Sequence, residues 1–202
     1  MTRGFAIGLT TAMLGLCVGC TGPSRRAEIP TGVWEGTGVF VLDKWTAQEE
    51  DQAATREAVD HGTYPTHLKI EPTTIDDAPA VRLEILSQRG GMKGLPDLGD
   101  RTHLILLLKR ADDLADGRIA LYELTKIGLS VSQAAPEMHD GPAGTTLASR
   151  FAINGDLVLH LLYQNGWVDR LRFHGDRVYK DGEYFDLDSG YIHWSEVLHR
   201  KR

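Results

Sequence analysis

LASRFAINGDLVLHLLYQNGWVDRLRFHGDRVYKDGEYF, residues 147–185, is the stretch that decides the fold. Four short segments divide it into runs of strand-forming residues: Asn154-Gly155, Asn165-Gly166, Gly175-Asp176 and Asp181-Gly182. Two-residue loops such as Asn-Gly favour the type I′ turn, in which both central residues need a positive φ. The stretch therefore predicts five antiparallel strands joined by tight turns, at residues 147–153, 156–164, 167–174, 177–180 and 183–185.

These turns also predict a register. Pairing Ile153 with Asp156 and Gln164 with Trp167, and treating the next two turns alike, aligns five large apolar residues in one row. The row consists of Phe151, Val158, Phe173, Val178 and Phe185. Because side chains alternate between the two faces of a strand, this row predicts the interior face of the sheet. The opposite face then carries Arg150, Arg170, Arg172, Tyr179, Tyr184, Leu157, Leu159 and Leu161.

Most of the remaining chain is also strand-like, at residues 33–42, 66–71, 81–86, 102–109 and 118–124. A long antiparallel meander must close or pack on a second sheet to protect its edges. The expected fold is therefore mainly β, an up-and-down meander that forms a lipocalin-like barrel or a strongly curved sheet.

Two helices are expected beside the strands. Thr46-Ala-Gln-Glu49 is a capping box, and it predicts a helix over residues 46–61 that stops at His61-Gly62. A second, short helix is expected at the C-terminus, over residues 195–202, where Lys201 and Arg202 suit the negative end of a helix dipole.

The N-terminus has the features of an export signal. Arg3 precedes an apolar run over residues 5–18, which is too short to span a bilayer as a helix but suits a signal peptide. The run ends in Leu16-Cys17-Val18-Gly19-Cys20. Its last two residues resemble the lipobox of bacterial lipoproteins, Leu-x-[Gly/Ala]-Cys, although Cys17 stands where leucine is usual.

The lipoprotein resemblance implies three segments: a signal peptide over residues 1–19, a lipidated tether over 20–31 and a β domain over 32–202. It implies acylation of Cys20 and attachment to a membrane of the cell envelope. Thr21 follows in place of aspartate, which in that family favours the outer membrane, facing the periplasm. An uncleaved N-terminal anchor is the alternative. A C-x-x-C redox pair is a further reading of Cys17 and Cys20, but that motif needs a folded βαβ context.

The start of the β domain, Gly32-Val33-Trp34, is similar to the Gly-x-Trp opening of lipocalin-like (calycin) barrels, in which the tryptophan plugs the closed end. With Gly36 and Gly38 it also resembles the opening strand of nitrobindin-type haem barrels. That resemblance implies a haem-ligating histidine near the C-terminus. The residues that could serve, there or inside a barrel, are His193, His199, His103 and His160.

Composition excludes other classes of function. The chain has 202 residues and a net charge of −6, which argues against nucleic acid as a partner. Its only cysteines are Cys17 and Cys20, so the domain has no disulfide framework. The closest histidine pairs are six residues apart, not the three or four that share a helix face, and no metal site is expected.

Three functions are compatible with these patterns. The apolar row, with Ser149 and His160 as polar contacts, predicts a small apolar ligand bound inside the barrel. A non-enzymatic envelope or interaction protein with a solid interior is the alternative. The predicted register also places Ser149 opposite His160 with Asp169 diagonal to it, which suggests a hydrolase, although no G-x-S-x-G elbow exists.

Overall fold

The computed structural model describes residues 26–46, 55–88, 101–132, 134–141, 145–150, 155–162, 168–186 and 190–202. In this part of the chain the regular elements are eleven strands. They are β1 (Gly32–Thr46), β2 (Thr55–Ile75), β3 (Ala78–Gln88), β4 (Arg101–Leu114), β5 (Ile119–Ser130), β6 (Met138–Asp140), β7 (Thr145–Arg150), β8 (Leu157–Leu162), β9 (Val168–His174), β10 (Arg177–Asp186) and β11 (Gly190–Arg200).

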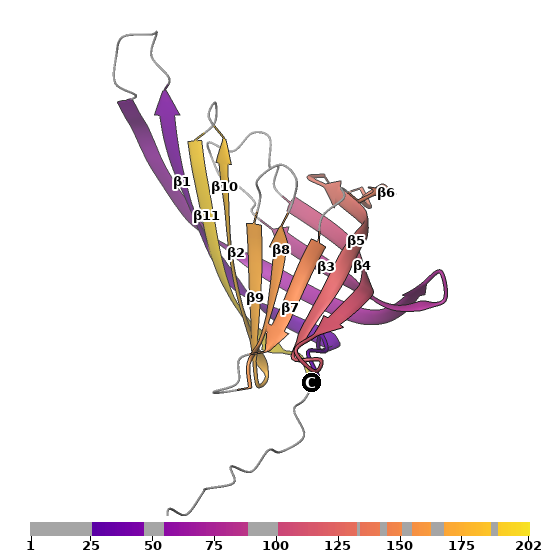
Figure 1. The fold of residues 1–202 in the computed structure, drawn as a ribbon. Coiled ribbons are helices and arrows are strands. Elements are labelled where there is room, and N and C mark those ends of the chain that lie inside the picture. Colours follow the sequence, from indigo (N-terminus) through magenta and orange to yellow (C-terminus); the bar gives the residue numbers. More distant parts are fainter. Residues whose placement is uncertain are drawn as a thin grey trace, which may run out of the picture.

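Ten of these strands close into an antiparallel barrel (Figure 1). Around the barrel the order is β1, β2, β3, β4, β5, β7, β8, β9, β10 and β11, and β11 pairs with β1 from Trp34↔Arg200 to Asp43↔Tyr191. The short strand β6 adds to β5 outside this ring. The prediction of a mainly β, up-and-down barrel is confirmed, with ten strands where a lipocalin has eight.

The two predicted helices are corrected. Residues 55–61 lie in β2, where they extend the hairpin with β1, and residues 47–54 lie outside the described residues. The predicted C-terminal helix is part of β11. Its side chains alternate between buried and exposed, with Trp194, Glu196 and Leu198 turned inward. This strand completes the ring of hydrogen bonds, so pairing with two neighbours outweighs its local helix signals.

The predicted register holds at only one of the four turns. Phe173 pairs with Val178 across the two-residue turn at Gly175-Asp176, as predicted, and Gly175 has a φ of +60°. Between β7 and β8 the register differs by two residues, so that Ser149 faces Val158 instead of His160.

The other two turns are predicted wrongly. Leu157, not Val158, pairs with Phe173, and this slip of one residue exchanges the two faces of β8. Asp181-Gly182 is not a turn at all, because β10 continues through it. A Cβ atom at Gly182 would lie 2.3 Å from the indole ring of Trp194. The glycine therefore makes room for an aromatic ring.

One end of the barrel carries the tight turns at residues 115–118 and 175–176, and both ends of the described chain lie there (Figure 1). The backbone N–H of Ala27 donates to the carbonyl of Gly117 at 2.7 Å, and Ala27 and Ile29 are buried in the main apolar cluster. Trp34 belongs to the same cluster and meets Phe173 edge to face at 5.9 Å. We call this the closed end.

Candidate functional site

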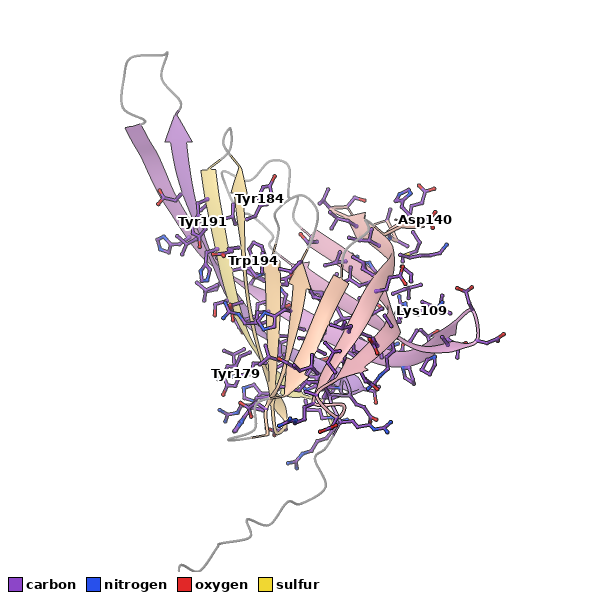
Figure 2. The ribbon with its side chains drawn as sticks, viewed as in Figure 1. Lys109, Asp140, Tyr179, Tyr184, Tyr191 and Trp194 are labelled. Atoms are coloured by element: carbon purple, nitrogen blue, oxygen red, sulfur yellow. The ribbon has the colours of Figure 1, made fainter. Side chains whose placement is uncertain are left out.

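The barrel contains two separate apolar clusters. The larger, lower cluster fills the closed end and includes Trp34, Leu68, Phe173, Val178 and Leu198. The smaller, upper cluster lies toward the opposite end and consists of Phe40, Leu42, Tyr64, Ile192 and Trp194, with Tyr184 packed against it. Figure 2 shows Trp194 and Tyr184 in the half of the barrel remote from the C-terminus.

Between the two clusters the inward-facing side chains become polar. On β11 the inward order from the closed end is Leu198, Glu196 and Trp194. On β10 the inward order from the closed end is Val178 and then Lys180. On β2 the inward residue between Leu68 and Tyr64 is Thr66. Lys180 pairs directly with Glu196, and Thr66, Ser87 and Thr102 pair with one another across β2, β3 and β4. Asp169 and Thr66 contact the Lys180–Glu196 pair diagonally, so these positions form one polar group inside the barrel. We call it the polar layer; it consists of Thr66, Ser87, Thr102, Asp169, Lys180 and Glu196.

Three charged side chains form the centre of the polar layer. Lys180 Nζ lies 2.9 Å from Glu196 Oε1 and 3.4 Å from Asp169 Oδ1. Only 5% of Lys180 and 1% of each acidic residue is exposed. Removing charged groups from water is costly unless they are paired and hydrogen-bonded, so the arrangement depends on all three.

Neutral donors complete this centre. Tyr64 Oη donates to Glu196 Oε1 at 2.9 Å, and Thr66 Oγ1 donates to Glu196 Oε2 at 3.0 Å. Trp194 Nε1 donates to Asp169 Oδ1 at 2.9 Å. The carboxylates thus accept hydrogen bonds from strands on both sides of the β1–β11 seam.

A line of hydroxyl groups continues from the charged centre around the barrel. Thr66 Oγ1 lies 3.3 Å from Ser87 Oγ, and Ser87 pairs with Thr102 in the register of β3 and β4. Thr102 is only 6% exposed, yet its Oγ1 has no hydrogen-bond partner among the described residues. A buried hydroxyl without a partner is unfavourable, so this position can accept a polar group from elsewhere.

The electrostatics of the polar layer are dominated by burial. Burial raises the pKa of Asp169, and the negative charge of Glu196 acts in the same direction. The Lys180 ammonium and the hydrogen bond from Trp194 oppose this rise. With both carboxylates ionised the three groups carry a formal charge of −1, so the interior favours an additional positive charge or proton.

Glycines allow the aromatic rings of the upper cluster to lie against the barrel wall. A Cβ atom at Gly38 would lie 2.4 Å from the ring of Tyr64, and one at Gly62 would lie 2.5 Å from Phe40. A Cβ at Gly36 would lie 1.9 Å from the carbonyl oxygen of Val197 in the adjacent strand. The glycines of the opening motif therefore have packing roles in this barrel.

The predicted apolar row is split by the observed register. Phe173 and Val178 are buried inside. Val158 is also buried, but it pairs with Arg172 on the outer face and is not part of the lower cluster. Phe151 lies outside the described residues, and of Phe185 only the backbone is described. The leucines of β8, expected on the outer face, are instead in the lower cluster.

The three residues of the suggested hydrolase site are not brought together. His160 pairs with Arg170 and Ser149 with Val158, which places both on the outer face. Asp169 pairs with Leu161 and is directed inward to Trp194. Burial and the positive charge of Arg170 lower the pKa of His160. A sheet therefore separates His160 from Asp169.

The residues do not fit an axial haem ligand either. His193 and His199 alternate with the inward residues of β11 and lie on its outer face, as His160 does on β8. His103 Nε2 lies 2.6 Å from Glu84 Oε1, outside the barrel. Over the described ranges, no group of three or more potential metal-ligating side chains is found.

Sequence reasoning missed Lys180 and Glu196, although a signal for both exists. Each is a charged residue at an inward position of an otherwise apolar alternation, Val178-x-Lys180 and Trp194-x-Glu196-x-Leu198. This signal is obscured because Asp181-Gly182 predicts a turn and the basic end of residues 195–202 predicts a helix.

No protein-family model matches the chain, and no curated protein matches it. In the described ranges there is also no helix of the length and apolar character that crossing a membrane would require.

Proposed function

We propose that this chain is a lipid-anchored protein of the bacterial cell envelope whose barrel binds a small, mainly apolar molecule. The observation that supports binding is the buried charged centre of Lys180, Glu196 and Asp169 between two apolar clusters. Apolar side chains would line such a ligand, and the polar layer would orient it.

A purely structural barrel does not need this centre. Replacing a buried ion pair by apolar residues of similar volume is often neutral or stabilising by about 1–4 kcal/mol. The lower cluster shows that the chain can fill a barrel level with leucine, valine and aromatic residues. Charge at the next level is therefore better explained by recognition of a polar group than by stability.

The proposed anchor also suggests an orientation. Cys20 precedes Arg26, the first described residue, by six positions, so an extended connection would measure at most about 20 Å. The segment from Ala27 to Ile29 packs on the closed end. An acylated Cys20 would thus hold the closed end close to the bilayer, and the upper cluster would face away from it.

Mass spectrometry of the protein extracted from its native membrane tests both parts. The intact chain should begin at Cys20 and carry acyl chains, and Cys20→Ser should abolish membrane retention. Under non-denaturing conditions a small molecule should remain bound. An unmodified N-terminus would contradict the anchor.

The binding part is tested with an apolar fluorescent probe added to the purified chain. Phe40→Ala removes a buried ring of the upper cluster and should weaken probe binding. Val39→Ala is the matched control, because Val39 is the next residue of β1 and is 46% exposed. Absence of binding by the unsubstituted chain would instead favour a barrel with a solid interior.

A further inference from the structure

We infer that the polar group of the bound molecule is a positively charged amine, held by the Asp169–Lys180–Glu196 centre and the aromatic side chains above it. This inference rests on the proposed binding function and specifies the chemical class of its ligand. Three independent features of the interior support it.

The first feature is the direction of the hydrogen bonds. Tyr64, Thr66, Lys180 and Trp194 all donate to the carboxylates of Asp169 and Glu196. The chain has thus placed two carboxyl groups and one ammonium group in a water-poor interior. A ligand carboxylate would be a third acidic group beside them, whereas an ammonium group would balance carboxylate charge.

The second feature is the aromatic wall. The ammonium of Lys180 lies 5.6 Å from the ring centroid of Trp194, within the range of a cation–π contact. Tyr64, Phe40 and Tyr184 lie in the same upper cluster. Aromatic faces combined with carboxylates are a chemistry that proteins use to bind organic ammonium groups.

The third feature is the hydroxyl of Thr102. It is buried and lacks a hydrogen-bond partner among the described residues, at the end of the hydroxyl line from Glu196 through Thr66 and Ser87. A hydroxyl oxygen can accept a hydrogen bond from an ammonium group. This side chain offers a further contact, outside the charged centre, for a donor on the ligand.

The inference is tested with three molecules that share one alkyl chain: octylamine, octanol and octanoate, each below its micelle concentration. At pH 7 the first is a cation, the second neutral and the third an anion. Calorimetric titration of the full chain should show octylamine binding at least about tenfold more tightly than octanoate, with octanol between them.

Asp169→Asn then removes one of the two carboxyl groups from the centre while retaining its shape. The preference for octylamine over octanoate should fall by about tenfold or more. Asp181→Asn is the matched control, since Asp181 lies on the same sheet but pairs with Arg170 on the outer face. This control should leave the preference unchanged.

The outcomes separate the two proposals. Equal binding of the three molecules, or tighter binding of octanoate, would overturn the amine inference and leave ligand binding intact. Failure of all three to bind would contradict the proposed function itself. If Asp169→Asn does not fold, as judged by circular dichroism, the three affinities of the unsubstituted chain decide the question alone.

Discussion

The two halves of the barrel differ in the side chains that fill their interior. The closed end is filled by apolar side chains around Trp34 and covered by Ala27 and Ile29. Above it, the chain places Lys180 beside the carboxyl groups of Asp169 and Glu196. The lower half therefore supplies most of the stability of the fold, and the upper half carries features that stability alone does not explain.

The largest effect should follow a change in the lower half. Trp34→Ala removes a fully buried ring from the main cluster and should lower the free energy of unfolding by about 3–5 kcal/mol. Its Nε1 has no hydrogen-bond partner within the described part of the chain, so the loss reflects packing. Urea denaturation measures the change, with exposed Val197→Ala as a control expected within about 0.5 kcal/mol. A loss below about 1 kcal/mol would show that this end is not the main core.

A change in the polar layer should come next. Glu196→Ala removes the closer counter-charge of the buried Lys180 and the acceptor of Tyr64 and Thr66. We expect a loss of about 3 kcal/mol in the free energy of unfolding, measured by the same urea series. Adding Lys180→Met to Glu196→Leu should recover about half of it, because the buried cation that has lost its closer counter-charge is then absent.

Recovery of stability in the double apolar variant would indicate that the polar layer serves recognition and is not needed for stability. If the double apolar variant is much less stable than Glu196→Ala, the ion pair contributes to folding itself. Glu123→Ala, an exposed carboxylate on β5, is the control and should change stability by less than about 0.5 kcal/mol.

A smaller effect is expected at the wall of the upper cluster. Gly182→Ala places a methyl group against the indole of Trp194, which must move from its position beside Asp169. We expect a loss of about 1–3 kcal/mol in the free energy of unfolding and a shifted tryptophan emission. Ser195→Ala, exposed on the other face of β11, should change neither.

The position of Gly182 also shows why sequence reasoning reached the fold but not the site. Alternating strands and turn signals were sufficient for a mainly β barrel, because closure follows from many weak preferences that agree. An Asp-Gly pair, however, has the same sequence whether its glycine permits a turn or a close aromatic contact. The difference depends on Trp194, which pairs with Gly182 from the next strand, in a stretch where the sequence does not predict a strand.

The strand register was the second feature that the sequence did not predict correctly. The prediction took tight-turn geometry at residues 165–166 as the guide, although Leu157, Leu159 and Leu161 form the more apolar face of β8. The observed pairing follows this apolar face. A slip of one residue was enough to turn His160 outward and to separate it from Asp169, so a site built from side chains on adjacent strands is far more sensitive to register than the fold is.

The smallest effect, and the most specific to the upper half, concerns pH. Burial raises the pKa of Asp169, so the folded chain retains a proton at pH values where the unfolded chain has lost it. Through this group the free energy of unfolding should therefore fall as pH rises from the ordinary aspartate pKa to the raised one, and then become constant. Lys180 on β10 and Trp194 on β11 face this carboxyl and limit the size of the change, whereas Glu196, also on β11, increases it. Asp169→Asn should flatten the dependence in thermal unfolding across this interval, whereas Asp181→Asn on the outer face should preserve it. An unchanged slope in the Asp169 variant would mean that this carboxyl is ionised in the folded barrel throughout, and that Lys180 balances it fully without any ligand.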